Sequence, residues 1–432
     1  MKSNTPEGVA ARGDPGRGGF RRGLRAVRVL VACDRPWVFA GLAWAVYVAI
    51  AASHAGGLRS SPFPFFTYLA DAFLHGQTAL RLVPPETHDL SVVGGRIYLY
   101  WSPFPAALLV PFVALWGVGF SDVLFTAVVG ALNVGLVSAL LRSATARRLV
   151  RLSRLQRGIL VLFFAFGTVH LTLAPFGRVW FTGQVVGFAC VTLAYWAAIH
   201  LKGPRAFVLT GLALTGALLT RNHLVATGLW PLFHLVKTHR VTGSGLIRQV
   251  PYRHVALWAL PLVGGMAFLA WYNWARFGSP LENGLRFHQM GAEFVADYAR
   301  YGAFHPHYIP TNLYYQYLFY PLPERADTYQ GGGLFWLSPV FLAAGFAGVR
   351  RRTRGDAEVL GLSIALTAVP ILLLMGTGHI QFGPRYTLDF TTPLLMLAAM
   401  GLRSWRLRGL LGAACVSLFH YGYGALLFMR YL

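Results

Sequence analysis

Two carboxylates stand out in the polar stretch 54–101, which follows the first apolar segment of the chain. Asp71 lies in the segment 65–76, where apolar residues recur at helical spacing and Gly76 suits the end of a helix. An acid on a short amphipathic helix at the membrane surface can meet an acceptor from water and a substrate from the bilayer. Asp71 is therefore a candidate catalytic base; the alternative is that it faces solvent or pairs with Arg81.

The second carboxylate, Asp89, begins a segment with the pattern of two short strands. The sequence Val93-Gly-Gly-Arg96 predicts a tight hairpin turn between alternating runs. Asp89 is the second candidate catalytic residue, although an aspartate before a hairpin often only caps a turn. Arg96 and Tyr98, on the far side of the turn, are candidates for substrate binding.

Four arginines lie beside the ends of apolar segments where basic residues are not expected. They are Arg178, Arg221, Arg276 and Arg385. A charge near a membrane is costly and tends to be functional, and the guanidinium fork can bind two phosphate oxygens. A single arginine there usually extends to the lipid headgroups, but four at one level favour a lipid-phosphate site.

A second polar stretch, 274–333, is rich in tyrosine, histidine and proline. Aromatic faces with interleaved hydroxyl and amide groups suit sugars or headgroups, although they also suit an interfacial belt. We take His305, His307, Tyr314 and Tyr315 as further candidates for substrate binding. His305 and His307 lack a third ligand, so no metal site is predicted. No cofactor is certain, and a divalent metal stays an open alternative.

Composition indicates an integral membrane protein. Of 432 residues, 55% are hydrophobic and 12% charged, about half the charged fraction of a soluble domain. Apolar stretches of about 15–20 residues alternate with short arginine-rich joints. The net charge of +23 could suggest nucleic acid, but the arginines lie in joints rather than on one soluble face, so we expect no nucleic-acid partner.

The distribution of basic residues predicts the topology. If all twelve apolar segments crossed the membrane, the six arginines of 142–157 would lie outside, against the positive-inside rule. Segment 102–118 holds three prolines and is the weakest span. If it is re-entrant, 27 basic residues lie inside and 11 outside. We therefore predict an all-α membrane protein with about eleven transmembrane helices plus one re-entrant or juxtamembrane helix.

This topology divides the chain into a tail and a membrane domain. Residues 1–36 are predicted to be a basic cytoplasmic tail, mostly disordered, with a possible surface helix over 20–31. Residues 37–432 form the transmembrane domain, with outer loops at 54–120 and 274–333. The predicted location is the plasma membrane, with a cytoplasmic N-terminus and an extracytoplasmic active face.

These features together resemble the GT-C class of membrane glycosyltransferases, which includes protein O-mannosyltransferases and the aminoarabinose transferases of lipid A. The order is one inner span, an outer loop with an aspartate-bearing amphipathic helix, a proline-rich helix that dips into the membrane, and then a bundle. The matching stretches, in order over roughly 37–400, are 68–76, 89–90, 95–98, 101–112, 272–284, 308–315 and 383–389.

The resemblance implies an inverting glycosyltransferase of the cell envelope that uses a polyprenyl-phosphate sugar. The four arginines would hold the lipid phosphate, and an acid of the first outer loop would act as base on a lipid, glycan or protein acceptor. In the class that acid often precedes the amphipathic helix, but 60–66 holds none. Asp71 or Asp89 would then take the role. The alternatives are a transporter or flippase of a lipid-linked saccharide, or an inactive binding homologue.

Overall fold

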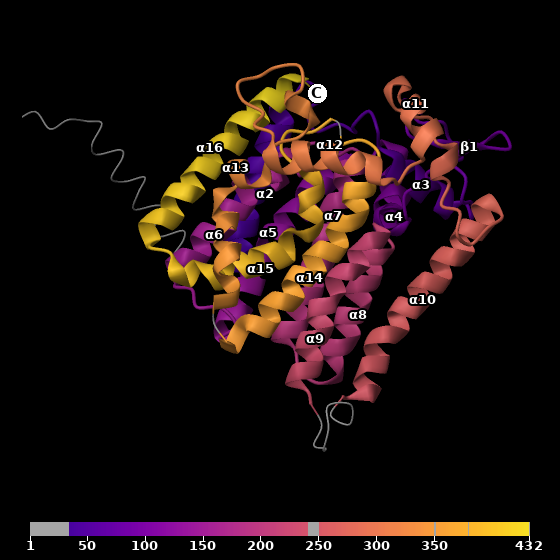
Figure 1. The fold of residues 1–432 in the computed structure, drawn as a ribbon. Coiled ribbons are helices and arrows are strands. Elements are labelled where there is room, and N and C mark those ends of the chain that lie inside the picture. Colours follow the sequence, from indigo (N-terminus) through magenta and orange to yellow (C-terminus); the bar gives the residue numbers. More distant parts are fainter. Residues whose placement is uncertain (1–33, 241–249, 350, 379, 432) are drawn as a thin grey trace, which may run out of the picture.

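The structure is a computed structural model that describes residues 34–240, 250–349, 351–378 and 380–431. It shows a bundle of helices with one short hairpin (Figure 1). The predicted all-α class is confirmed. The predicted disorder of the tail and its surface helix fall on 1–33, outside the described residues.

Seven helices are long and apolar enough to cross a membrane among the described residues. The chain is thus confirmed as a multi-pass membrane protein, while the count of eleven spans stays a prediction. The seven are α2 (Pro36–Ser53), α5 (Asp122–Ala146), α6 (Arg154–Phe166, extended by a 3-10 turn to Thr172), α7 (Val179–His200), α10 (Tyr252–Phe277), α14 (Arg351–Leu373) and α16 (Leu407–Tyr431).

Shorter helices pack among these seven or cap one end of the bundle. In the bundle lie α8 (Pro204–Leu218), the 3-10 segment η3 (Asn222–Gly228) with α9 (Leu229–Thr238), α13 (Leu334–Leu337) with η9 (Pro339–Val349), and η10 (Arg385–Phe390) with α15 (Thr391–Gly401). At the end of the bundle lie α3 (Phe65–Leu74), α4 (Phe104–Trp116), α11 (Ala292–Tyr301) and α12 (Ile309–Leu313).

Both termini of helix α4 contact the same end of the bundle, which is what the re-entrant interpretation requires. At its start, the Phe104 amide donates to the carbonyl of Leu219, which follows α8. Just beyond its end, the Phe120 carbonyl accepts a hydrogen bond from Ser60 of the first loop. Its 13 residues span about 20 Å, less than the hydrocarbon core of a bilayer. Pro111, inside the helix, further weakens it.

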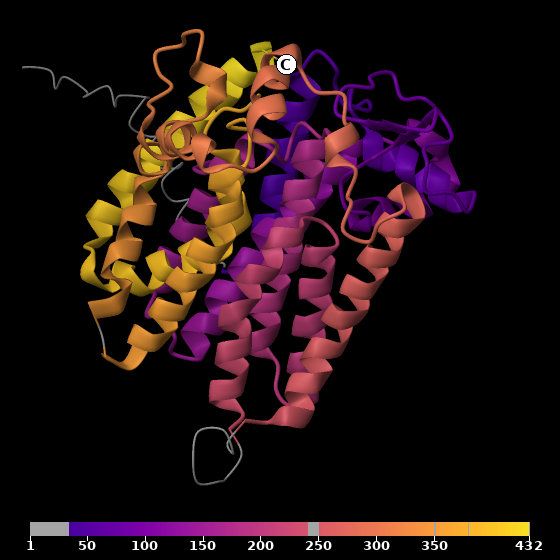
Figure 2. The same ribbon diagram turned by 45° about the vertical axis from the view of Figure 1, so that its right-hand side comes forward.

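The two long polar loops share one end of the bundle, and the basic joints lie at the other. In both ribbon views the region of α11, α12 and the hairpin lies opposite the last residues of α9 and the first residues of α10 (Figures 1 and 2). Arg147, Lys202, Lys237 and Thr353, from four different joints, line one hollow at the far end. Basic residues from several joints thus lie together at the end far from the long loops, while the inside and outside faces stay a prediction.

The predicted hairpin forms and ties the two long loops together. Strands β1 (Ser91–Val93) and β2 (Arg96–Tyr98) pair in antiparallel register. The turn residues Gly94 and Gly95 have φ of 55° and 73°, values that glycine adopts easily. Beside the hairpin, the Asp89 amide donates to the Gln289 carbonyl at 2.8 Å, and the Gln289 amide donates to the Leu90 carbonyl at 2.9 Å.

Candidate functional site

A cleft opens where the two loops meet the upper ends of the helices. It consists of two neighbouring cavities of about 270 and 350 Å³. We call the first the Asp89 lobe and the second the His223 lobe, after a residue that lines each. The two lobes share seven lining residues: Tyr100, Trp101, Trp180, Leu285, Leu374, Arg385 and Tyr386.

Asp89 is held in the first lobe by groups from several parts of the chain. The indole Nε1 of Trp180, at the start of α7, donates to Asp89 Oδ2 at 2.9 Å. The imidazoles of His88 and His288 lie 3.7 and 4.0 Å from Oδ1. Asp89 has φ of 64°, a left-handed conformation that is uncommon for a residue with a side chain. Such strain is concentrated at functional sites.

Arg178 lines the same lobe and also has a left-handed backbone, with φ of 67°. Its amide donates to Asp122 Oδ2 at 3.1 Å, which fixes the turn before α7. The guanidinium is buried, lies over the Phe63 ring at 5.6 Å, and makes no hydrogen bond to a described residue. Burial lowers the pKa of Arg178 to about 10, so it is still charged at neutral pH. The charge of Asp122 partly offsets the effect of burial on Arg178. Its guanidinium N–H groups still lack hydrogen-bond partners among the described residues, and a buried cation of this kind favours an anionic ligand.

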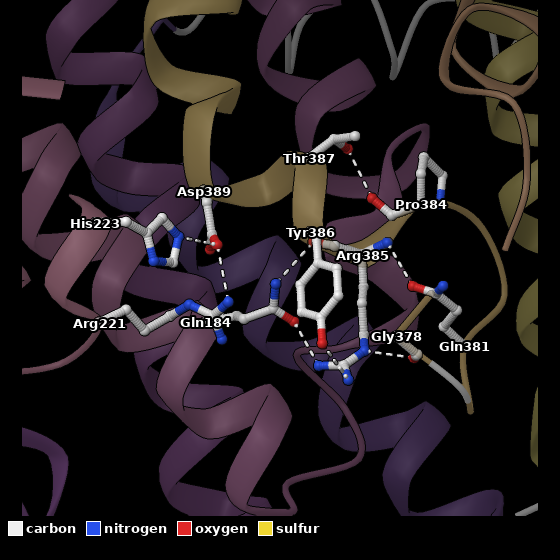
Figure 3. A network of polar contacts seen from close by, with 10 residues as sticks. All are labelled: Gln184, Arg221, His223, Gly378, Gln381, Pro384, Arg385, Tyr386, Thr387 and Asp389. Atoms are coloured by element: carbon white, nitrogen blue, oxygen red, sulfur yellow. Dashed lines mark hydrogen bonds and ion pairs between the residues drawn. The ribbon is translucent and has the colours of Figure 1, made fainter. Parts of the chain in front are cut away.

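Arg385, at the start of η10, lines both lobes and is anchored by Gln184 of α7 (Figure 3). Gln184 Nε2 donates to the Arg385 carbonyl at 2.8 Å, and Arg385 Nη1 donates to Gln184 Oε1 at 3.2 Å. Nε donates to the Gly378 carbonyl, and Nη2 contacts the Tyr386 hydroxyl at 3.4 Å. A guanidinium has five N–H groups, so two remain for a ligand. Burial lowers the pKa of Arg385.

Asp389 holds two side chains that line the His223 lobe (Figure 3). Its Oδ2 accepts from His223 Nε2 at 2.8 Å and lies 3.0 Å from Arg221 Nη2. Only one Arg221 nitrogen is engaged in this way; Nε is buried without a partner among the described residues. The second lobe therefore also offers guanidinium donors, balanced by one buried carboxylate.

Aromatic rings form much of the wall between the lobes. Tyr100 stacks on Trp101 with ring centroids 3.8 Å apart, and Trp180 packs against Phe63 at 4.8 Å. Burial is the main cause that raises the pKa of Tyr100 well above its usual value, so its hydroxyl stays protonated. Flat apolar rings beside cations suit a ligand with a sugar ring and an anionic group.

Asp71, the other candidate base, lies outside the cleft. Its carboxylate is buried and accepts two hydrogen bonds at 3.0 Å from Arg81, one from Nε and one from Nη2. This is the alternative that the sequence left open. The ion pair raises the pKa of Arg81 and occupies both Asp71 oxygens.

Arg276, predicted to bind phosphate, also lies outside the cleft. Its guanidinium is buried and donates to the carbonyls of Leu99 and Tyr272 and to Asn273 Oδ1. These bonds fasten α10 to the end of the first loop. Of the four predicted arginines, the structure brings together Arg178, Arg221 and Arg385.

Of the six predicted substrate-binding residues, two line a third cavity, one (Tyr98) is buried, and three are exposed. His307 and Tyr315 line a cavity of about 350 Å³ beside the Asp89 lobe, which we call the side cavity. His305 is exposed and accepts a hydrogen bond from the His307 amide. Tyr98 packs on Phe277. Arg96 and Tyr314 are exposed and line none of the three cavities.

Within the described ranges, no group of three or more histidine, cysteine, aspartate or glutamate side chains could hold a metal ion. Sequence reasoning missed Trp180, Gln184, His223 and His288. His223 follows a predicted site arginine, so its position was a usable signal. Trp180 and Gln184 are ordinary residues beside an apolar segment, and His288 is one of several histidines in the second polar stretch. Only the three-dimensional contacts reveal these three.

The comparisons with known proteins concern the fold. No protein-family model matches the chain, and no curated protein matches it in sequence. The fold is similar to that of ArnT from Cupriavidus metallidurans bound to undecaprenyl phosphate, with a TM-score of 0.51 and 15% identity. The comparison with the apo form of the same protein gives a TM-score of 0.52 and 15% identity. Each match covers 87% of this chain and 61% of ArnT.

The chain thus spans about three fifths of the length of ArnT. A weaker match, to the oligosaccharyltransferase AglB of Archaeoglobus fulgidus in complex with an inhibitory peptide and a dolichol-phosphate, has a TM-score of 0.41 and 12% identity. It covers 90% of this chain and 55% of AglB. The chain has the GT-C-like membrane fold that ArnT represents, as its motifs predicted.

Proposed function

We propose that this chain is a glycosyltransferase that moves a sugar from a polyprenyl-phosphate donor to an acceptor, with inversion at the transferred carbon. The observation that carries the proposal is Arg178, a buried guanidinium with no hydrogen-bond partner among the described residues, in the same lobe as Asp89. The site therefore offers a guanidinium with free N–H groups for a phosphate and a carboxylate for a proton.

The lipid phosphate would bind between Arg178 and Arg385. Arg178 contributes its free guanidinium, and Arg385 contributes the two N–H groups that Gln184, Gly378 and Tyr386 do not occupy. Hydrogen bonds hold the Arg385 guanidinium in place, and the Arg178 guanidinium is buried over the Phe63 ring. Both can therefore stabilise the charge that develops on the leaving phosphate. The similar structure of ArnT was determined with undecaprenyl phosphate bound, which supports a ligand of this class.

Asp89 is the proposed base. Its carboxylate would take the proton of an acceptor hydroxyl or amine while the acceptor oxygen or nitrogen forms a bond to the sugar carbon. The bond from that carbon to the phosphate oxygen breaks, and the polyprenyl phosphate leaves with the negative charge. Asp89 is preferred to Asp71 because it lines the cleft with the two arginines, whereas both Asp71 oxygens are bound to Arg81.

The cleft would face the extracytoplasmic side. The basic joints gather at the opposite end of the bundle, where Arg147, Lys202 and Lys237 share one hollow. Because basic loops remain in the cytoplasm, the long loops and the cleft belong outside, where a donor in the outer leaflet can enter.

Two measurements on the purified chain in lipid nanodiscs test the proposal. The first is binding of undecaprenyl phosphate to wild type, Arg178→Gln and a control, Arg300→Gln, at an exposed arginine that lines none of the three cavities. We expect Arg178→Gln to weaken binding about tenfold or more, since a charged hydrogen bond contributes roughly 1.5–3 kcal/mol. Arg300→Gln should bind as wild type does.

The second measurement is transfer of radiolabelled sugar from the lipid-linked sugars of host membranes. Asp89→Asn should lower the rate by roughly 10²–10⁴-fold without changing the binding of undecaprenyl phosphate by more than about twofold. Binding without transfer by the wild type would contradict the transferase and favour an inactive homologue. Movement of the lipid-linked sugar across the bilayer without transfer would favour a flippase.

A further inference from the structure

The side cavity adjoins the Asp89 lobe and differs from it in charge. The two share Glu293, Phe294, Met375 and Gly376 as lining residues. A molecule in the side cavity can therefore extend a reacting group toward Asp89. Its volume of about 350 Å³ suits a ring of sugar size.

The charged residues that line the side cavity are acidic. Glu293 and Asp297 lie one turn apart on α11 and both line it. Neither carboxylate makes an ion pair or a hydrogen bond with a described residue. No lysine or arginine is among its lining residues, so the two acids are not balanced there. The cleft also contains the acids Asp89 and Glu293, but three arginines outnumber them: Arg178, Arg221 and Arg385. A phosphate would be repelled by the side cavity and attracted by the cleft.

Asn312 also lines the side cavity, and its side-chain oxygen accepts no hydrogen bond from a described residue. Asn312 is 1% exposed, and its Nδ2 donates to the carbonyls of Leu372 and Leu374 at 2.9 Å. These bonds leave Oδ1, which is buried and has no partner among the described residues. A buried acceptor of this kind is costly unless a ligand supplies a donor. It is a second feature, independent of the acids, that calls for hydroxyl or amino groups.

An aromatic edge completes the side cavity. Tyr315 lines it, and His307 lines it while stacked on Tyr301 with ring centroids 4.0 Å apart. Aromatic rings beside carboxylates and amides bind the apolar faces of sugar rings while the polar groups bind the hydroxyls.

We propose that the side cavity is the acceptor subsite, and that it selects a neutral or cationic saccharide with several hydroxyl or amino groups. This rests on the proposed function, because it assigns the acceptor to a position beside the proposed base. In the reaction, one acceptor hydroxyl loses its proton to Asp89 and its oxygen bonds to the sugar carbon of the donor. The polyprenyl phosphate departs on the arginine side of the cleft.

The test compares the binding of three probes to the chain in nanodiscs at low ionic strength. The probes are methyl glucoside, methyl 2-amino-2-deoxyglucoside and glucose 6-phosphate, titrated by saturation-transfer NMR. We expect the amino sugar to bind on the order of tenfold more tightly than the phosphate. In the double variant Glu293→Gln, Asp297→Asn that ratio should fall to about twofold or less. The control Glu86→Gln, at an exposed acid of the first loop outside all three cavities, should keep it.

Three results would overturn the acceptor subsite. They are equal binding of the amino sugar and the phosphate by wild type, no binding of any probe, and a ratio that the double variant leaves unchanged. Undecaprenyl phosphate binding, measured on the same samples, separates this failure from that of the proposed function. The double variant should bind that lipid no more weakly than wild type, which also shows that it is folded. If wild type binds no undecaprenyl phosphate, the proposed function fails whatever the sugars do.

Discussion

The indole of Trp180 donates a hydrogen bond of 2.9 Å to the Asp89 carboxylate, across 91 positions of the chain. This bond ties the first long loop to the start of α7, and it leaves Asp89 Oδ1 near two imidazoles. The proposed base is therefore oriented by a residue that cannot itself take its proton, since an indole N–H only donates.

Replacing Trp180 should impair the reaction without unfolding the chain. Trp180→Phe keeps a ring but removes the hydrogen bond to Asp89, and a bond to a charged group contributes about 1.5–3 kcal/mol. We expect the rate of sugar transfer to fall about tenfold or more. Trp196→Phe, near the other end of α7, is the matched control. A transfer rate for Trp180→Phe equal to that of the control would show that the bond does not position the base.

The ion pair of Asp71 predicts a structural effect rather than a catalytic one. Asp71→Asn weakens two hydrogen bonds to Arg81, whose side chain is 38% exposed. We expect the free energy of unfolding to fall by about 1 kcal/mol. Transfer, measured below the melting temperature, should stay within about threefold of wild type. A loss as large as that expected of Asp89→Asn would make Asp71 the base.

Phosphate binding should depend on pH through Arg178. The pKa of this group is lowered to about 10 by burial, so the guanidinium is charged at pH 8 and loses its proton as the pH rises through 10. The second ionisation of a phosphate lies near pH 6 and contributes no step in that range. We expect the affinity for undecaprenyl phosphate to be level from pH 8 to about 9 and to fall above that. The Arg178→Gln variant should lack the part of the fall that is due to Arg178, and an identical profile in that variant would rule out this assignment.

The pair Arg221 and Asp389 predicts a coupled effect on stability. Asp389→Asn leaves the Arg221 guanidinium, 12% exposed, without its counter-charge, and breaking such a buried pair costs roughly 3–5 kcal/mol. The double variant Arg221→Gln, Asp389→Asn removes both charges and should recover a large part of that loss. Thermal melting in detergent measures both. Equal melting temperatures for the single and double variants would mean that the pair is not coupled.

The orientation of the chain can be tested by labelling. Two single-cysteine variants, made after Cys33, Cys190 and Cys415 are changed to serine, place a thiol at Val83 of the first loop or at Ala146 at the end of α5. An impermeant maleimide added to intact cells should label Val83→Cys, and Ala146→Cys should react only after the membrane is opened. The reverse pattern would place the cleft in the cytoplasm.

The lengths of the apolar segments and the positions of the charged residues predicted which helices form and at which end of the bundle each loop lies. The apolar segment before the arginines of 142–157 was expected to cross the membrane, and α5 (Asp122–Ala146) is one of the seven helices long enough to do so. The six arginines of 142–157 led to the re-entrant interpretation, which stays a prediction. The contacts of Phe104 with Leu219 and of Phe120 with Ser60 agree with it. Gly94 and Gly95 predicted the hairpin turn correctly. These features depend on local composition or on the membrane, so a single sequence can show them.

The arrangement of the site depended on contacts between distant segments. Nothing in the sequence distinguishes Arg178 from Arg276, because both follow an apolar run. In the structure the Arg276 guanidinium donates to carbonyls of the first loop and of its own helix. The Arg178 guanidinium makes no hydrogen bond to any residue that the structure describes. The link from Gln184 to Arg385 spans 201 positions. Tertiary packing decides such pairings, and a search for motifs in the sequence cannot detect them.

The most direct measurement is an experimental structure of the chain in a lipid nanodisc with undecaprenyl phosphate. We predict that the phosphate lies in the Asp89 lobe, with its oxygens about 2.7–2.9 Å from nitrogens of Arg178 and Arg385 and with the Asp89 carboxylate facing the open part of the lobe. A phosphate bound away from this lobe, with the Arg178 guanidinium still unpartnered, would contradict the account.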